Sequence, residues 1–304
     1  MSRPKEPRRP APPPGLLIVD KPAGMTSHDV VARARRIMGT RKVGHAGTLD
    51  PMATGVLVLG IERATKLLGH LALDRKTYLA TLALGRSTTT DDAEGEALAD
   101  ADPATLAKIT DADIAAGIAK LTGEIQQVPS AVSAVKIDGK RAYARVRAGE
   151  EVVLPPRPVT VYRFDLLATR REEDRIELDA VVECSSGTYV RALARDLGAD
   201  LGTGGHLQAL RRTTVGPFTL ARARTLDQLE DKPELSLDLD AAVAAAFPRR
   251  DLDAATARAV RHGQRIPAAG IEGTYGLFAP DGRVLALAAD EHGVARSVVV
   301  LLPA

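Results

Sequence analysis

Cysteine, aromatic residues and long apolar runs are all scarce in this sequence. Cys184 is the single cysteine among 304 residues, which excludes an internal disulfide framework and is typical of a reducing compartment. Tryptophan is absent and aromatic residues make up only 3% of the chain, so each of the five tyrosines is worth locating. No apolar run is long enough for a signal peptide or a membrane span. We therefore expect a cytoplasmic protein.

Sequence patterns that bind metals are also missing. The chain contains no HExxH motif, no CxxC pair and no cluster of histidines and cysteines, so we expect no metal site. The remaining composition, 45% hydrophobic and 26% charged, is ordinary for a globular protein with a buried core. A length of 304 residues suffices for one large domain with a small one, or for two of ordinary size.

Charge is distributed unevenly, although the formal net charge is only +2. Residues 1–50 contain ten Lys and Arg against four Asp and Glu, whereas residues 91–124 contain two against nine. Segregated charge of this kind suits a protein that presents a basic face to a polyanion. On charge alone, solvated protein surfaces are the more common explanation.

The N-terminal pattern predicts a flexible tail, then a strand and a helix. Residues 1–14 hold six prolines and four basic residues, and they cannot bury enough apolar surface to become ordered. We expect the structure to begin at Gly15, with a buried strand over 16–19. Ser27 has the position of a helix N-cap, and Gly39 is expected to end that helix.

The hydrophobic pattern of the remaining chain predicts further elements. Strands are expected over 56–59, 76–84, 159–168 and 175–183. Helices are expected over 62–71, 112–121, 189–200 and 206–212. Residues 125–158 show little regular patterning, and a segment of that length in a compact domain is usually functional or disordered. A helix over 252–262 and strands over 273–278, 283–289 and 294–301 predict a separate small β-rich module.

A glycine-rich loop carries the most informative residues. Residues 44–55 read GHAGTLDPMATG, and the glycines permit tight curvature and close approach to a ligand. Asp50 precedes Pro51, which favours extended backbone at the aspartate and can present its carboxylate at a loop tip. The alternative is a turn aspartate that caps its own backbone, and for an isolated Asp-Pro pair this is the more common case.

This loop resembles the signature of the TruB family of tRNA pseudouridine synthases, and the resemblance extends over roughly residues 15–230. Five blocks carry it in the order of the family: GLLIVDKPAGMTSHDVV (15–31), RKVGHAGTLDPMATGVLVLGIERATK (41–66), KTYLATLALGRSTTTDDAEG (76–95), SAVKIDGKRAYARVRAG (133–149) and CSSGTYVRALARDLGADLGTGGHLQALRRTTVGPF (184–218). Coincidence in five ordered blocks with these spacings is implausible.

The resemblance implies an α+β fold in which a mixed, mainly antiparallel sheet is flanked by helices. Residues 15–235 would form the pseudouridine synthase catalytic domain, with 125–158 as a thumb-like loop that binds RNA. Residues 248–304 match more loosely, and they are similar to the small β-rich, PUA-like RNA-binding domain that ends many family members.

The reaction implied by the resemblance converts uridine 55 in the T loop of tRNA to pseudouridine. Since the bond from N1 to C1′ is exchanged for one from C5 to C1′ of the same base, no cofactor, metal or second substrate is expected. The expected partner is the T stem-loop of tRNA, and we expect a monomer. Three alternatives stay open: a synthase acting at another RNA position, a non-catalytic tRNA chaperone, and an aspartate-dependent hydrolase of another substrate.

Three residues would carry the chemistry by the same resemblance. Asp50 would be the nucleophile, because a carboxylate can stabilise or bond to the sugar carbon as positive charge develops there. Arg191 would pair with Asp50, lower its pKa and fix its orientation, with Arg195 as the competing candidate. Tyr78 would stack on the uracil or transfer a proton.

Further residues would hold the RNA. The target base must leave its stack, and His45 would fill the vacated space while Tyr189 and Leu210 contact the target nucleoside. Thr89 stands where relatives often have an acidic residue, and the two aspartates that follow are candidates for its role. Phosphate contacts are expected from basic residues, namely Lys21, Lys136, Lys140, Arg141, Arg145, Arg147, Arg211 and Arg212.

Overall fold

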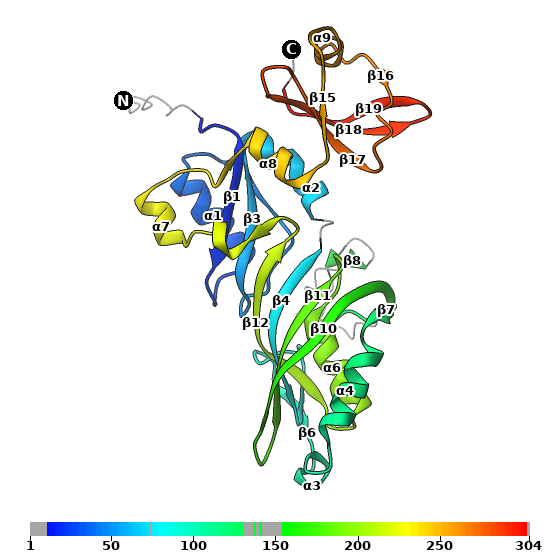
Figure 1. Cartoon of the computed structure of the whole chain (residues 1–304). Helices are drawn as coiled ribbons and strands as arrows, with labels where there is room; N and C mark the ends of the chain where they lie inside the picture. Colours follow the sequence, from blue (N-terminus) through cyan, green and yellow to red (C-terminus); the bar gives the residue numbers. More distant parts are fainter. Residues whose placement is uncertain (1–10, 73–74, 131–135, 138–139, 142–153, 303–304) are drawn as a thin grey trace, which may run out of the picture. The chain divides into compact units, whose positions relative to one another are not determined.

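The structure, a computed structural model, describes residues 11–72, 75–130, 136–137, 140–141 and 154–302. It divides into two compact units, which can be followed along the chain by colour in Figure 1. The first contains Met1–Pro51, Gly55–Ala72 and Val215–Ala304, and the second contains Met52–Thr54 and Leu73–Thr214. Most of the expected N-terminal tail, residues 1–10, lies outside the described residues.

The first unit is built on the buried strand β1 (Gly15–Lys21). It pairs antiparallel with β3 (Thr54–Ile61), which also pairs antiparallel with β2 (Val43–Ala46). At its start β1 pairs with β14 (Leu237–Asp238). The four apolar residues over 16–19 are fully buried, as expected for a short apolar run in a sheet that is covered on both faces. The predicted first strand is confirmed.

Helix α1 (Ser27–Ile37) follows β1 and begins one residue earlier than the sequence suggested. Its N-cap is Thr26, whose hydroxyl accepts from the backbone N–H of Asp29 while the Asp29 carboxylate accepts from the N–H of Thr26. Ser27 is therefore not the N-cap, because this reciprocal capping box already satisfies the helix start. Gly39, with φ +64°, lies just past the C-cap as predicted.

We expect Thr26→Ala to lower the free energy of unfolding by about 1 kcal/mol, because it removes an N-cap. Urea denaturation measures this directly. Thr110→Ala is the matched control, since Thr110 and Asp113 form the same capping box at helix α4 (Asp111–Lys120). The two substitutions should cost about the same, and an unchanged urea midpoint in Thr26→Ala would contradict the assignment of the cap.

The second unit contains an antiparallel run of four strands, β4 (Lys76–Leu84), β11 (Ile176–Cys184), β10 (Arg157–Arg171) and β7 (Gly123–Gln127). Alternate residues of β11 are buried, from Ile176 to Cys184. This confirms the strand predicted from period-two alternation. Strand β4 has the predicted bounds.

Helices α4 and α6 (Val190–Asp200) belong to the same unit and lie side by side (Figure 1). Lys120 at the end of α4 forms an ion pair with Asp200 at the end of α6, at 2.8 Å. The close approach needs Gly117, where an added Cβ would lie 2.6 Å from a methyl carbon of Leu197. Both helices were predicted to within two residues.

The expected helix over 206–212 is wrong, because these residues belong to strand β12 (Gly205–Val215). Strand β12 lies next to β4 in the sheet. The apolar residues in this segment have the spacing of a helix. Pairing with a neighbouring strand in the sheet overrides that local preference. Gly205 brings β12 against α6, since a Cβ there would lie 2.4 Å from the carbonyl oxygen of Ala194.

The C-terminal part of the first unit forms a second sheet, in the order β15-β17-β18-β19-β16. Its elements are β15 (Arg249–Asp251), α9 (Ala254–Arg261), β16 (Ile266–Pro267), β17 (Thr274–Phe278), β18 (Val284–Glu291) and β19 (Val294–Val300). The helix and three long strands predicted here are confirmed. The sheet has its own apolar cluster around Tyr275, while Phe278 and Leu287 join a second cluster that includes Leu16 of β1. The boundaries of this domain stay a prediction.

The remaining elements are short. They are η1 (Glu62–Leu67), α2 (Leu68–Leu71), β5 (Arg86–Thr88), β6 (Ala97–Asp100), α3 (Pro103–Leu106), β8 (Lys136–Ile137), β9 (Lys140–Arg141), β13 (Phe218–Thr219), η2 (Leu220–Arg222), α7 (Leu226–Asp231) and α8 (Leu239–Ala246). With helices beside a mainly antiparallel sheet and a β-rich C-terminal part, the predicted α+β class is confirmed.

Candidate active site

Asp50 lies in the loop between β2 and β3 of the first unit, and its side chain is partly buried. In the residue before it, Leu49, the backbone N–H and the carbonyl both bond to one hydroxyl group, that of Ser27. The Leu49 N–H donates to Ser27 Oγ at 2.9 Å, and that hydroxyl donates to the Leu49 carbonyl at 3.2 Å. Ser27 and Leu49 are both buried, so the link is shielded from water.

The residue after it, Pro51, is held as well. Its carbonyl accepts from Lys21 Nζ at 3.1 Å and from the Gly24 N–H at 2.8 Å. The proline ring additionally restricts the backbone torsion φ at this position. The peptide group before Asp50 and the one after Pro51 are therefore held by residues 22–30 positions earlier in the chain, which is how a loop can place a carboxylate precisely.

Lys21 does not have the role expected from the sequence. Its side chain is completely buried, and Nζ also donates to the carbonyls of Pro22 at 2.8 Å and Met25 at 2.6 Å. A lysine in this environment braces the turn between β1 and α1, so the expectation that it meets an RNA phosphate is wrong. Backbone carbonyls compensate the desolvation of its charge.

His45 lies on β2, opposite Leu59 of β3, and is partly buried. The ring of the exposed His28, on the first turn of α1, meets it edge to face, with ring centroids 5.4 Å apart and planes at 83°. A planar side chain held by a second ring suits a wedge in RNA. The proposed contact of His45 with the RNA stays a prediction.

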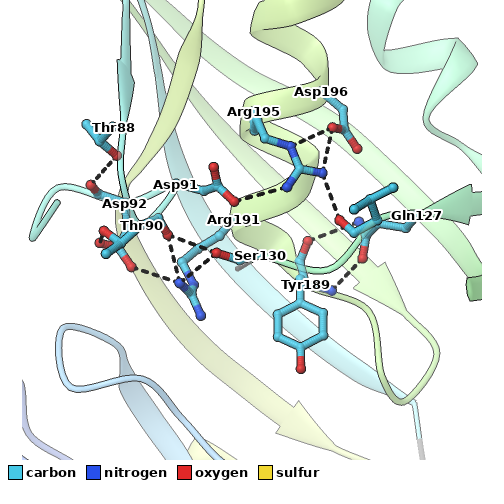
Figure 2. Close-up of polar contacts among 11 residues, drawn as sticks. Thr88, Thr90, Asp91, Asp92, Gln127, Ser130, Tyr189, Arg191, Arg195 and Asp196 are labelled. Carbon is cyan, nitrogen blue, oxygen red and sulfur yellow. Dashed lines mark hydrogen bonds and ion pairs between the residues drawn. The ribbon is translucent and has the colours of Figure 1, made fainter. Parts of the chain in front are cut away.

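Arg191 lies in the first turn of helix α6 of the second unit and is almost completely buried, with 4% of its side chain exposed. Figure 2 shows acceptors from two loops at one nitrogen of its guanidinium. Nη1 donates to the Thr90 carbonyl at 2.7 Å and to Ser130 Oγ at 3.2 Å, and it lies 3.3 Å from a carboxylate oxygen of Asp92. The structure thus fixes this arginine in one orientation.

Asp92, one of the two aspartates that follow Thr89, is the acidic partner of Arg191. Its other carboxylate oxygen accepts from the Thr90 hydroxyl and from the Glu94 N–H, the latter at 3.1 Å. Like Arg191, Asp92 is buried, and charge pairs of this kind hold only when hydrogen bonds satisfy the remaining atoms. The idea that the aspartates after Thr89 take over its role agrees with this arrangement.

Arg195, the alternative partner for Asp50, is occupied within the second unit. It pairs with Asp91 at 3.1 Å and with Asp196 at 2.8 Å, and it donates to the Val128 carbonyl at 2.8 Å. Burial raises the pKa of the Asp196 carboxyl, and the neighbouring Arg195 partly opposes that shift. Between the two arginines, Arg191 is the more buried, which favours it as the site residue.

Gln127 holds an expected site residue, Tyr189, in a contact that the sequence did not indicate. It ends β7, and its buried amide makes two bonds to Tyr189, accepting from the N–H at 2.8 Å and donating to the carbonyl at 3.1 Å. Tyr189 is the N-cap residue of α6, and its ring points away from Gln127 (Figure 2). No local pattern marks a glutamine for such a contact, because its partner lies 62 residues away.

The other expected site residues occupy varied positions in the second unit. Tyr78 is buried on β4 opposite Val182 of β11, and Leu210 is half-buried on β12. Arg211, also half-buried, donates to Thr54 Oγ1 at 3.2 Å. Arg212 is 1% exposed, so its expected phosphate contact is wrong.

The thumb-like segment is described only in part. Lys136 lies in β8, and Lys140 and Arg141 form β9, but their side chains lie outside the described residues. Arg145 and Arg147 lie outside the described residues altogether. Asp50 and Arg191 belong to different units, so their pairing also stays a prediction.

Two further titratable residues are buried in the second unit. Cys184 ends β11, and burial raises the pKa of its thiol to about 11, which keeps it protonated and unreactive at neutral pH. His206 is buried and lies within hydrogen-bonding distance of the Arg86 carbonyl, at 3.0 Å, and of Gln208 Oε1, at 3.3 Å. Both residues therefore contribute to the packing of the second unit.

No group of three or more His, Cys, Asp or Glu side chains converges on a possible metal position in the described ranges. Across those same ranges, no helix has both the length and the apolar character needed to cross a bilayer.

Three family models match consecutive parts of the chain. The model for the TruB family pseudouridylate synthase N-terminal domain matches residues 35–190. The tRNA pseudouridylate synthase B C-terminal domain matches residues 191–243, and the C-terminal model of tRNA pseudouridine synthase II matches residues 247–302.

Curated proteins are similar over nearly the whole chain. A protein named tRNA pseudouridine synthase B from Nocardia farcinica (strain IFM 10152) is 63% identical over 289 residues, which cover 95% of this chain and 94% of that protein. The protein of the same name from Mycobacterium bovis (strain BCG / Pasteur 1173P2) is 57% identical over 291 residues, covering 96% and 97%.

Solved structures share the fold. A Cbf5-Nop10-Gar1 complex contains a chain that matches with a TM-score of 0.70 and 26% identity, covering 95% of this chain and 85% of that one. An H/ACA RNP bound to a substrate RNA containing 2'-deoxyuridine gives the same TM-score of 0.70 and the same coverage at 24% identity.

Proposed function

The chain belongs to the TruB family of pseudouridine synthases, and on that premise we propose that it converts uridine 55 in the T loop of tRNA to pseudouridine, with Asp50 as the nucleophile. The names of its relatives support tRNA as the substrate. The observation that carries the assignment of Asp50 is the loop geometry. Both neighbours of this partly buried aspartate have their backbones bonded to buried side chains.

The reaction is balanced without any added reagent. The bond from N1 to C1′ breaks, the base turns, and C5 bonds to C1′; C5 loses its proton and N1 gains one. As the first bond breaks, positive charge develops on the sugar carbon, and the Asp50 carboxylate can stabilise that charge or bond to the carbon. Attack on the base and elimination to a glycal are two further routes open to the same carboxylate.

Three other residues complete the proposed site. Arg191 keeps the Asp50 carboxylate ionised; little water screens its charge in the second unit, where it is shared with Asp92. Tyr78 stacks on the extruded uracil, and Tyr189 and Leu210 contact the same nucleoside. His45 occupies the space that the base leaves in the RNA.

Affinity for tRNA comes mainly from phosphate contacts, which carry little sequence information. Arg211 is the candidate in the described second unit, with Lys136 and Arg145 in the thumb-like segment. We propose that the protein acts in the cytoplasm, as a monomer and without metal or cofactor.

A direct assay tests the proposal. Purified protein is incubated with unmodified tRNA in EDTA, with no added cofactor, and pseudouridine is mapped at single-nucleotide resolution. We expect modification at position 55, and none in a matched tRNA that carries cytidine there. Tight binding without pseudouridine would indicate a tRNA chaperone, and modification at a different uridine would indicate another target; either result overturns the proposal as stated.

A further inference from the structure

We propose that Ser27 is a positioning residue for Asp50, and that its hydroxyl sets the rate of the chemical step without contacting the RNA. This inference rests on the proposed role of Asp50 as nucleophile. It assigns to α1 a task in catalysis, beyond its contribution to the fold.

The two bonds of the Ser27 hydroxyl determine where the Asp50 backbone can lie. The bond to the Leu49 carbonyl, at 3.2 Å, holds the peptide group that ends at the nitrogen of Asp50. The bond from the Leu49 N–H, at 2.9 Å, holds the peptide group before it. With two successive peptide planes held by one oxygen atom, the nitrogen and Cα of Asp50, from which the side chain extends, are held in place.

Ser27 is available for this task because it does not cap its own helix. Thr26 forms the capping box with Asp29, so the start of α1 is satisfied without the neighbouring hydroxyl. The Ser27 side chain is instead 1% exposed, and Leu49 is 4% exposed. Water cannot readily replace the hydroxyl at such a position, so removing it leaves the Leu49 N–H and carbonyl without those bonds.

The loop is also held on the other side of Asp50, at Pro51. The effect of Ser27 on the position of Asp50 can therefore be measured while these other bonds stay in place. Lys21 and Gly24 hold the carbonyl of Pro51, and both bonds remain when the Ser27 hydroxyl is removed. The loop would then be anchored at one end and released at the other. We expect the Asp50 carboxylate to shift slightly, while the loop as a whole stays folded.

The test is single-turnover kinetics of Ser27→Ala with saturating enzyme, well below its unfolding temperature. We expect the rate of pseudouridine formation to fall by about 10- to 100-fold, since a misplacement of about 1 Å costs up to that much. The Kd for tRNA should change by less than about threefold, because Ser27 is buried and does not meet the RNA. Hydrogen exchange of the Leu49 amide should be faster in the variant.

Two matched variants separate positioning from general stability. Thr26→Ala removes the neighbouring cap and leaves the link from Ser27 to Leu49 in place. Ser236→Ala removes another serine hydroxyl of the first unit, one that accepts from the Ile18 N–H at 2.9 Å. Both should be less stable than the wild type, but their single-turnover rates should stay within about threefold of it.

Asp50→Asn, measured in parallel, distinguishes failure of this inference from failure of the proposed function. If Asp50→Asn is inactive but Ser27→Ala has the wild-type rate, the role of Ser27 is refuted and the nucleophile stands. If Asp50→Asn is active, the proposed chemistry fails first. If Ser27→Ala does not fold, Ser27→Cys keeps a similar volume with a weaker hydrogen-bonding group, and a wild-type rate in that variant equally refutes the inference.

Discussion

Asp50→Asn is expected to abolish pseudouridine formation, with a fall in the single-turnover rate of about 10⁴-fold or more. Asparagine has nearly the shape of aspartate, but its amide is neutral and is a poor nucleophile at a sugar carbon. The Kd for tRNA should change by less than about tenfold, or ~1.4 kcal/mol, because one carboxylate contributes little to a contact dominated by phosphates. Mapping pseudouridine after a long incubation measures the residual rate.

Asp227→Asn is the matched control for this substitution. Its carboxylate is 89% exposed on α7 of the same unit and pairs only at the surface, with Arg33 at 3.4 Å. Exchange of an exposed carboxylate should change neither rate nor stability appreciably. If Asp50→Asn forms pseudouridine as fast as this control does, Asp50 is not the nucleophile.

Arg191→Lys is expected to lower the single-turnover rate by about a hundredfold or more. A lysine keeps the positive charge but replaces the planar fork with a single ammonium group, which cannot pair with both oxygens of the Asp50 carboxylate as the fork can. Nη1 alone serves Thr90, Ser130 and Asp92 in the structure. The substitution therefore disturbs both the orientation of the cation and the packing of the two loops around it.

Arg195→Lys is the control that separates a site arginine from a structural one. Arg195 lies one helical turn later, is 27% exposed, and is surrounded by Asp91, Asp196 and a carbonyl group. We expect its rate to stay within about tenfold of the wild type, with a modest loss of stability. A normal single-turnover rate in Arg191→Lys would remove Arg191 from the site. A larger fall in rate in Arg195→Lys than in Arg191→Lys would make Arg195 the site arginine.

The two largest falls in rate are expected from substitutions of Asp50 and Arg191, and the surroundings of these two residues differ greatly. Asp50 is partly exposed in a loop, and its neighbours are held in place by α1 and the end of β1. Arg191 is buried in a helix, and loops hold its guanidinium. In both cases the position of the site residue depends on neighbours that do not take part in the proposed reaction. This is why we expect rate losses from substitutions such as Ser27→Ala, outside the set of reactive side chains.

Much of the local structure could be predicted from the sequence. The alternation of β11, the apolar run of β1 and the helical spacing of α4 and α6 each reflect a period that the final fold keeps. The strand β12 could not be predicted, because its residues also suit a helix and only the neighbouring strand decides between the two. The cap of α1 was misplaced by one residue for a similar reason, since Thr26 and Ser27 are equally good caps by residue type.

By itself, the sequence determined the family, the α+β class and the identity of the aspartate and arginine on which the proposed chemistry depends, because these are properties of residues in a fixed order. Only the tertiary structure decided what the supporting residues do. It buried Lys21 and Arg212, which looked like phosphate ligands, gave Arg191 the counterion Asp92, and turned the Ser27 hydroxyl toward Leu49. Burial and hydrogen-bond partners depend on segments far apart in the chain, so no local pattern contains them.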